Sequence, residues 1–458
     1  MLNTSLSLPS APDTNALWAS PDTFNQNDTT RLGTRLVYDI NDIFALRMGY
    51  GYQKDERETI FSSLTITSPT AYRLNKAFVR ANDTETNSAY AYLDSTFETL
   101  GIKHKMTFGM NGYISDGYAG YESSGSLPSM VGSVINNLSL ADASSANVSL
   151  PSYNFDSLNM LKTDSTKSKN ILIGDTIEMN DQWSTLLEIN HANYITKSFN
   201  PLTGDTTSYY GKSKSTPSLS LIYKPLSNIT IYTTYIESLQ QGSIVKNSGT
   251  TIYTNDGEVF EPVVSEQYEV GVKSELGNTL LTMALFQIDK ANAYTQYNSD
   301  GTYTMFQNGK QTHKGIETTL SGKVTDNLTL LGGVTLMDAE VKKSTNNLGV
   351  GKIPQGVAEE MAKLYAEYDL PFIPRLTVTG GLYYVGKSYL DVNNLQEVPS
   401  YTIADMGLRY TTKIYGNDTI FRLNVTNITD KAYWMSNYTI GTMLGSPRMV
   451  ELSATMKF

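Results

Sequence analysis

The chain has 458 residues, and its 35 Lys and Arg against 45 Asp and Glu give a formal net charge of -10. No basic stripe is present that could neutralise phosphates, so nucleic acid is excluded as a partner. Charged residues make up only 17% of the chain, below the roughly 25% of a soluble globular domain. The absence of cysteine excludes disulfides and thiolate metal sites, and His104, His191 and His313 lie too far apart in the sequence for a metal-ligand motif.

The N-terminal part of the chain does not resemble a membrane anchor. No run approaches the roughly 20 apolar residues of a membrane helix. The first residues, MLNTSLSLPSAPDTN, lack the basic and apolar regions of a signal peptide. Residues 1–29 are rich in Pro, Ser, Asp, Asn and Thr, and we predict a loop there.

Strand-like runs of residues then follow in pairs. The first pair is 31–40 with 43–52 around Asn41-Asp42, and the second is 85–98 with 103–113 around Leu100-Gly101. The segment 54–84 is polar and irregular. The segment 114–166, dense in Gly, Ser, Asn and Tyr, reads as a long loop.

From residue 167 the pairs become regular, and each has a turn signal between its two runs. The pairs are 167–179 with 182–197, 213–224 with 228–239, 264–275 with 278–291, 313–323 with 328–339, 361–370 with 375–386, and 401–411 with 419–427. The runs 218–224 and 421–426 alternate apolar and polar residues, as expected of strands with one lipid-facing and one lumen-facing side.

Connections between successive pairs are long, whereas turns within pairs are short. The long ones are about 198–212, 240–263, 292–312, 340–360, 387–400 and 428–446. This asymmetry is typical of a transmembrane β-barrel with short periplasmic turns and long extracellular loops. Residues 361–370, within AEEMAKLYAEYD, would by themselves suit a short helix. A helix would break the parity of the surrounding hairpins, so we predict a strand.

The last stretch, Ser446 to Phe458, places Val450, Leu452, Met456 and Phe458 on one apolar face. We predict that it is the barrel-closing strand and that it ends at the periplasmic side. Counting back from it gives about seventeen strands. Bacterial single-chain barrels have even strand numbers, and an open sheet edge is not viable in hydrocarbon. We therefore expect that strands before Met1, and a signal peptide, are missing from this chain.

Several segments resemble a known family. FRLNVTNITDKAYW (421–434) and GSPRMVELSATMKF (445–458) resemble the closing hairpin of TonB-dependent outer-membrane receptors. Successive hairpins of the ferric-siderophore branch are similar to TPSLSLIYKPLSNITIYTTYIESLQQG (216–242), SEQYEVGVKSEL (265–276) and HKGIETTLSGKVTDNLTLLGGVTLMDAEV (313–341). The resemblance covers 167–458 well and 30–113 only in style.

The resemblance implies a 22-stranded barrel of the bacterial outer membrane, plugged by an N-terminal domain and energised through a TonB box. About 17 strands of the expected 22 are present, with no plug domain and no TonB box. The expected domains are 1–29 as an extracellular loop segment and 30–458 as the C-terminal part of the barrel, with 114–166 as a long extracellular loop. The implied function is TonB-dependent uptake of an Fe³⁺-siderophore complex, without a cofactor. Implied partners are the siderophore, the TonB complex, outer-membrane lipid and the barrel-assembly machinery.

Aromatic side chains of the long loops are the candidate ligand surface, because large amphipathic rings can grip a bulky chelate. They are Tyr118, Tyr121, Tyr294, Tyr297, Tyr303 and Trp434. Each of these side chains could equally pack within its loop or belong to the aromatic belt at the membrane interface.

We predict no catalytic and no metal-ligating residue. Asp289, Asp338 and Glu340 are interpreted as solvated rim charges, and an outer-membrane protease or lipase is disfavoured because no nucleophile-and-base constellation is present. The alternative function is a passive porin. It requires a constriction loop with opposed charges, which 114–166 lacks.

Overall fold

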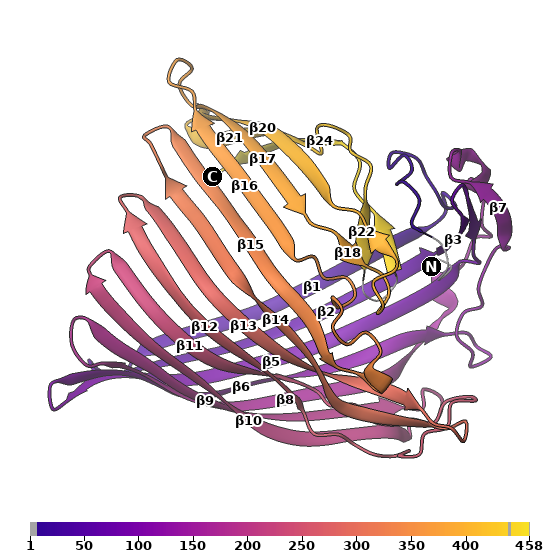
Figure 1. The fold of residues 1–458 in the computed structure, drawn as a ribbon, viewed down its shortest axis with the longest axis horizontal. Helices are drawn as coiled ribbons and strands as arrows, with labels where there is room; N and C mark the ends of the chain where they lie inside the picture. The colour runs from indigo at the N-terminus through magenta and orange to yellow at the C-terminus, as the bar shows by residue number, and fades with distance from the viewer. Residues whose placement is uncertain (1–6, 438–440, 458) are drawn as a thin grey trace.

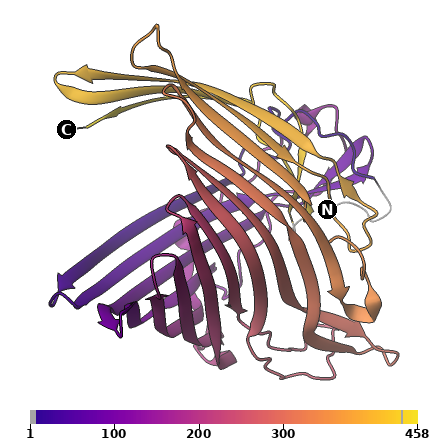
Figure 2. The same ribbon diagram turned by 60° about the vertical axis from the view of Figure 1, so that its left-hand side comes forward.

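The structure is a computed structural model that describes residues 7–437 and 441–457. Its main element is one antiparallel sheet of seventeen strands, in agreement with the predicted number. The strands are tilted, and the sheet curls so that its early strands lie across from its later ones (Figures 1 and 2). Within the described residues no helix has the length and apolar character that a membrane crossing requires.

The sheet strands, in the order in which they pair, are β1 (Phe24–Asp39), β2 (Phe44–Phe61), β5 (Phe78–Thr99), β6 (Ile102–Tyr121), β8 (Asn159–Glu178), β9 (Trp183–Phe199), β10 (Thr206–Leu226), β11 (Ile229–Gln240), β12 (Val263–Leu276), β13 (Thr279–Tyr297), β14 (Tyr303–Lys323), β15 (Leu328–Lys343), β16 (Glu360–Asp369), β17 (Leu376–Val385), β20 (Tyr401–Ile414), β21 (Asn417–Thr426) and β24 (Met449–Met456). The smaller sheets are β3 (Leu64–Ser68), β4 (Ala71–Leu74) and β7 (Ile135–Ser139); β18 (Ser388–Tyr389) with β19 (Glu397–Val398); and β22 (Trp434–Asn437) with β23 (Gly441–Leu444). The 3₁₀ turns are η1 (Ala143–Ala146), η2 (Phe155–Ser157) and η3 (Thr345–Asn347).

Tight turns join the strands of each hairpin at one end of the sheet, which we call the short-turn end. In the β5–β6 turn, Leu100 has φ 54° and Gly101 has φ 79°. In the β20–β21 turn, Tyr415 has φ 51° and Gly416 has φ 85°. Positive φ at both central residues is the type I′ conformation, whose twist matches that of the flanking strands. The opposite end carries the longer connections, and we call it the long-loop end.

The two faces of the sheet differ in polarity, as the alternation predicts. On β13, Met283 and Leu285 are 43% and 53% exposed on the outer face. The inner face carries polar pairs, including a bidentate ion pair in which Arg409 donates to Glu367 over 3.0 and 2.7 Å. Apolar outside and polar inside is the pattern of a barrel that meets lipid on its outer surface.

Three boundaries differ from the prediction. Strand β1 begins at Phe24, inside the segment 1–29 that was predicted as loop. Strand β2 continues to Phe61 and strand β5 begins at Phe78, so both extend into the predicted irregular segment 54–84. Beyond the membrane both faces of a sheet meet water, so the apolar alternation stops while the backbone hydrogen bonds continue.

The connections are correspondingly shorter than predicted. The long loop 114–166 is reduced to 122–158, and it contains β7, η1 and η2. The predicted loops 198–212 and 292–312 are mostly strand, with only 200–205 and 298–302 as connections. Residues 361–369 lie in a strand, β16, that pairs with β15 and β17. The strand prediction there is confirmed.

Each edge strand of the sheet has a partner on one side only. Within residues 7–437 and 441–457, β1 pairs with β2 alone and β24 with β21 alone. Val450 and Leu452 are 65% and 78% exposed on the outer parity of β24, and Met456 lies opposite Thr419. Phe458 lies outside the described residues. That β24 closes a barrel therefore stays a prediction.

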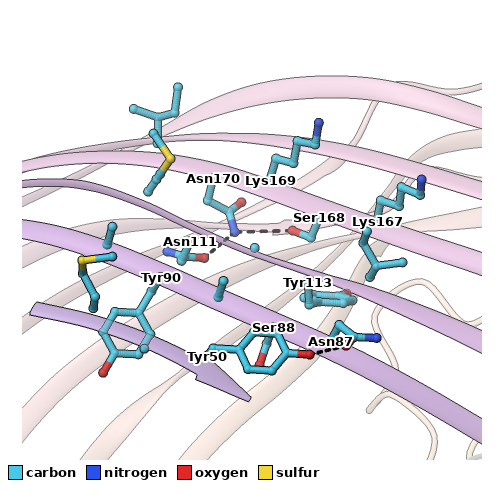
Figure 3. Close-up of a pocket in the computed structure, with 18 of the residues that line it drawn as sticks. Tyr50, Asn87, Ser88, Tyr90, Asn111, Tyr113, Lys167, Ser168, Lys169 and Asn170 are labelled. Carbon is cyan, nitrogen blue, oxygen red and sulfur yellow. Dashed lines mark hydrogen bonds between the residues drawn. The ribbon is translucent and has the colours of Figure 1, made fainter. Parts of the chain in front are cut away.

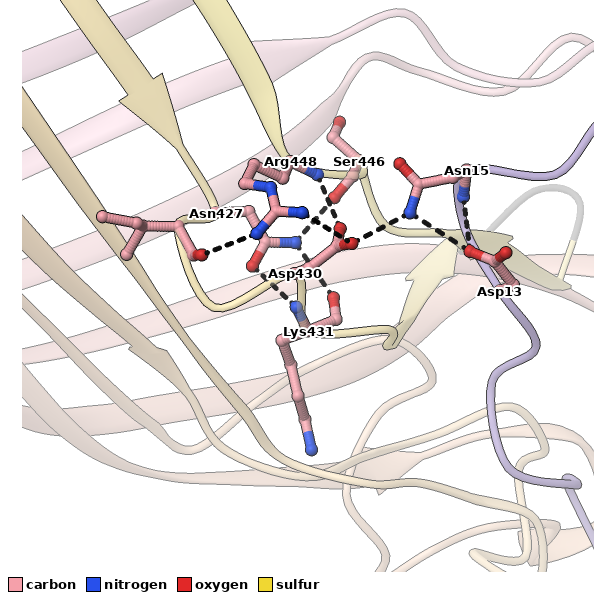
Figure 4. A network of polar contacts seen from close by, with 8 residues as sticks. Asp13, Asn15, Asn427, Asp430, Lys431, Ser446 and Arg448 are labelled. Carbon is pink, nitrogen blue, oxygen red and sulfur yellow. Dashed lines mark hydrogen bonds and ion pairs between the residues drawn. The ribbon is translucent and has the colours of Figure 1, made fainter.

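The N-terminal segment contacts the last long connection at the long-loop end. The indole N–H of Trp434 donates to the carbonyl of Pro9 over 2.7 Å. Asp430 accepts from the Asn15 amide and from the Arg448 backbone N–H, both over 3.0 Å (Figure 4). We call these five residues the N-terminal clasp. It joins the segment that leads into β1 to the loop that leads into β24.

A small apolar core anchors the same segment. Trp18 is 7% exposed and packs edge-on against Tyr72 of β4, with ring centroids 5.8 Å apart. Leu138 of β7 and Leu444 of β23 contact this cluster. Residues 7–23 are therefore held between the loops of both sheet edges.

Because the outer face of the sheet is apolar, we predict that a charge introduced there destabilises the barrel. We expect Met283→Arg to destabilise the barrel by about 2–4 kcal/mol, because its side chain would enter hydrocarbon. Thr319→Arg is the matched control, since residue 319 lies on the inner face of the neighbouring strand β14 with Glu317 on the same face. Urea titrations of protein folded into liposomes measure both free energies. Equal losses for the two variants would contradict the assignment of faces.

The clasp predicts a pH dependence. Hydrogen bonds from the Arg448 backbone and the Asn15 amide hold the pKa of Asp430 below its ordinary value, which is about 4. The stabilisation is therefore fully present above about pH 4 and is lost as the pH falls through the lowered pKa. Hydrogen exchange of residues 9–18 should stay slow from pH 7 to pH 5 and become faster in Asp430→Asn. Asp181→Asn, in a short turn, is the control that should leave this exchange unchanged.

Candidate functional site

The predicted tyrosines lie in strands, not in loops. Tyr118 and Tyr121 are among the last four residues of β6, and Tyr294 and Tyr297 are in β13. Tyr303 is the first residue of β14. All five belong to the parts of the strands that extend toward the long-loop end.

The structure brings two of these tyrosines into contact. Tyr297 and Tyr303 are paired residues with ring centroids 5.1 Å apart. Tyr294 packs on Phe306 at 5.5 Å, on the opposite face of the same hairpin. Tyr253, in the β11–β12 loop, lies 6.1 Å from Tyr303. We call Tyr253, Tyr297 and Tyr303 the aromatic cluster. Tyr297 is 59% exposed, so the cluster presents a ring to solvent.

The β11–β12 loop is held on the aromatic cluster by its backbone. Tyr303 donates its backbone N–H to Ile252 over 2.8 Å, and Thr254 donates to Tyr303 over 2.7 Å. The hydroxyls of Thr254 and Thr304 lie 2.6 Å apart. The β11–β12 loop is therefore held in place by hydrogen bonds to β14 at the long-loop end of the sheet.

The other predicted aromatic residues lie elsewhere. Tyr118 and Tyr121 are opposite Lys162 and Asn159 of β8. Trp434 belongs to the N-terminal clasp, where its only hydrogen-bond donor is already used by Pro9. These three residues do not form one surface with the aromatic cluster through any contact between described residues.

An inner pocket of about 810 Å³ opens at the long-loop end between β11 and the β15–β16 loop. It is lined by polar and apolar side chains, among which are Gln241, Phe286, Ile288, Lys290, Asn292, Gln311, His313, Met337 and Gln355. On β13 the even-numbered residues, from Phe286 to Asn292, share the inner parity opposite to Leu285. The pocket therefore faces the interior of the curled sheet.

Two polar atoms of the inner pocket are buried without a hydrogen-bond partner among the described residues. They are Nε2 of His313 and Oδ1 of Asn292. A Cβ on Gly309 would lie 2.1 Å from that Asn292 oxygen, so only glycine leaves room for the amide. A buried polar atom left unpaired costs about 1–3 kcal/mol. Asn292 and His313 both line the inner pocket, and these two atoms lie beneath its surface.

Neighbouring contacts fix the walls of the inner pocket. Gln241 accepts a hydrogen bond from Thr196 over 2.7 Å. Gln355 donates to the carbonyl of Leu390 over 2.7 Å, which holds the β15–β16 loop inward. Lys290 adds a cation to the lining. The pocket combines an apolar floor with amides, an imidazole and one ammonium group.

Sequence reasoning missed this pocket. The signal that could have found it is parity: Lys290 and His313 lie on the inner parity of adjacent strands, where a lumen site must be built. The partners from the β11 end and from residues 354–357 carry no local signal, because only the fold brings them there. Across the described part of the chain, no group of three or more His, Cys, Asp or Glu is arranged to hold a metal ion.

Comparison with known proteins gives the context of these features. Residues 2–428 match the family model described as TonB dependent receptor-like, beta-barrel. The ferrichrome receptor FcuA of Yersinia enterocolitica is 27% identical over 308 residues, which are 66% of this chain and 40% of that receptor. A TonB-dependent receptor of Haemophilus influenzae is 30% identical over 252 residues, 52% of this chain and 71% of that protein.

A solved structure matches along the whole chain. The ferric preacinetobactin receptor BauA of Acinetobacter baumannii superposes with a TM-score of 0.85 at 27% identity, covering 100% of this chain and 67% of that one. The chain thus spans only part of the length of its relatives. The family match, the antiparallel barrel strands and the polar interior agree, and the chain belongs to the TonB-dependent receptor β-barrel family of the bacterial outer membrane.

Proposed function

We propose that this chain is the barrel portion of a receptor that takes up ferric siderophores by TonB-dependent transport. The observation that carries the proposal is the 27% identity to a ferric preacinetobactin receptor along the whole chain. The similarity to a ferrichrome receptor supports the same substrate class. The iron enters as a chelate, which is cargo, so the chain needs no metal ligands of its own.

We propose that the chelate binds in the inner pocket after meeting the aromatic cluster. The exposed ring of Tyr297 offers a flat amphipathic surface. Nε2 of His313 and Oδ1 of Asn292 would gain hydrogen bonds that the described protein atoms do not supply. Lys290 favours an anionic group on the ligand. Tyr118, Tyr121 and Trp434 remain proposed contacts of the wider mouth.

Active uptake by this proposal requires parts beyond the seventeen strands. The free edges of β1 and β24 would leave backbone groups unpaired in hydrocarbon, so we propose that further strands cover them. The polar inner face, with ion pairs such as Arg409–Glu367, suits contact with a polar plug domain. The plug would couple the barrel to TonB, and β24 with Leu452 would be the strand that the barrel-assembly machinery handles.

Energy dependence distinguishes active from passive transport. In iron-starved cells that produce the whole receptor, uptake of ⁵⁵Fe-labelled siderophore should fall to background when TonB is deleted. A passive porin would show the same uptake with and without TonB. Persistence of uptake after the deletion would refute the proposed function.

The inner pocket predicts a specific loss of affinity. We expect His313→Ala to weaken siderophore binding about tenfold, since one hydrogen bond to a buried group is worth roughly 1.4 kcal/mol. His191→Ala is the matched control, because His191 lies on the outer parity of β9 and bonds to Ser215. Fluorescence quenching by the ferric siderophore measures both affinities. A smaller loss in His313→Ala than in His191→Ala would contradict this location.

A further inference from the structure

A part of the inner face of the sheet carries no charge. On β6, Met110 is 57% exposed on the outer face, so its neighbour Asn111 lies on the inner face. Asn111 lies opposite Tyr90 of β5 and Asn170 of β8. Asn170 in turn lies opposite Ala192 of β9. The residues of this inner parity include no Asp, Glu, Lys, Arg or His within four adjacent segments, namely 86–92, 109–115, 166–172 and 190–196. We call this surface the uncharged wall.

Hydrogen bonds between neighbouring strands orient the side chains of the uncharged wall. Asn170 donates to Asn111 over 2.8 Å, and Asn111 donates to the hydroxyl of Tyr92 over 2.8 Å. The same nitrogen of Asn170 lies 3.4 Å from the hydroxyl of Ser168 (Figure 3). The wall therefore presents fixed polar groups that can exchange hydrogen bonds with a passing molecule.

Two glycines let tyrosine rings lie flat on the uncharged wall. A Cβ on Gly49 would lie 2.4 Å from Cε1 of Tyr90, and a Cβ on Gly109 would lie 2.4 Å from Cδ1 of Tyr92. The two rings are stacked, with centroids 5.4 Å apart. Because each ring occupies the space that a side chain at the glycine would fill, the rings cover the wall and do not project from it.

Other parts of the inner face are charged. Inner residues of β12, β14 and β16 include Glu269, Glu317 and Lys363. A fixed charge attracts an ion of opposite sign strongly and repels an ion of like sign. Passage through a channel requires contacts that are favourable but weak and repeated. The uncharged wall is a part of the interior where a charged chelate would be neither held nor repelled by an ion.

The uncharged wall is connected to the inner pocket. At the long-loop end of the wall the hydroxyls of Thr86 and Ser115 lie 2.9 Å apart, and those of Thr166 and Thr196 lie 3.4 Å apart. Thr196 donates to Gln241, which lines the inner pocket, over 2.7 Å. From these hydroxyls the wall continues toward the short-turn end for about 20 Å, since a strand rises about 3.3 Å per residue.

We propose that the uncharged wall is the side of the barrel along which the chelate leaves the inner pocket toward the periplasm. The rings of Tyr90 and Tyr92 and the amides of Asn111 and Asn170 make weak, exchangeable contacts with it. This proposal rests on the proposed uptake function, because it assumes that a chelate crosses the interior of the barrel.

The maximal rate of ⁵⁵Fe-siderophore uptake by cells that produce the whole receptor tests the proposal, with the affinity measured separately in cells without TonB. We expect Ser88→Asp and Ser88→Lys each to lower the maximal rate about tenfold and to leave the affinity unchanged. The reason is that a charge of either sign on the wall must lose water when the chelate passes over it. Gly49→Ala should also lower the maximal rate, because its Cβ displaces the Tyr90 ring into the interior.

Matched changes elsewhere on the inner face are the controls. Thr282 lies opposite Lys273, beside a charge that is already present, so Thr282→Asp and Thr282→Lys should leave the maximal rate unchanged. Gly333→Ala should do the same, since the nearest atom to its Cβ is a backbone oxygen 3.3 Å away and no ring is displaced. Unchanged affinity shows that a variant is folded.

Two results would overturn the proposal while the unchanged receptor still shows TonB-dependent uptake. They are a normal maximal rate in both Ser88 variants and in Gly49→Ala, or equal losses at Ser88 and Thr282. Uptake by the unchanged receptor that persists without TonB would refute the proposed function and, with it, this proposal.

Discussion

The need to pair every backbone N–H and C=O inside hydrocarbon is the constraint on which this structure depends. An unpaired group in the membrane costs several kcal/mol, whereas a paired strand can carry any side chain that suits its surroundings. The sequence can therefore place apolar residues such as Met283 and Leu285 outward and ion pairs such as Arg409–Glu367 inward on the same sheet. The two faces then serve different purposes. The inner pocket is built on the polar one of these two faces.

The same constraint explains which features could be predicted from the sequence. Within the membrane, parity and tight turns are both enforced, so the number of strands and the turns at Leu100-Gly101 and Gly416 were correctly predicted. Outside the membrane water satisfies the backbone and both faces can be polar. The alternation of apolar and polar residues then disappears although the strand pairing continues. For this reason the predicted start of β1 was too late, and the loops that are observed at 200–205 and 298–302 were predicted too long.

Contacts between distant segments were beyond prediction for a different reason. Asn15 and Asp430 meet only because the sheet places both of its edges near the same loops. The inner pocket likewise combines Gln241, His313 and Gln355 from three separate connections or strands. Two of the aromatic residues predicted to contact the ligand, Tyr297 and Tyr303, are in contact with each other because they flank one hairpin turn, and their role as ligand contacts stays a prediction. Proximity along a hairpin is readable in a sequence, and proximity across a barrel is not.

The N-terminal clasp and the pairing of strands differ in how much free energy each contributes to the fold. The clasp supplies three hydrogen bonds, two of them exposed to water that competes for the same groups. The free edge of β1 is 16 residues long, and about half of an antiparallel edge points its N–H and C=O groups away from the existing partner. Even the few of these groups that lie in hydrocarbon would together cost far more than the clasp supplies. The clasp can therefore order the loops at the long-loop end, but only strand partners can stabilise the two edges in the membrane.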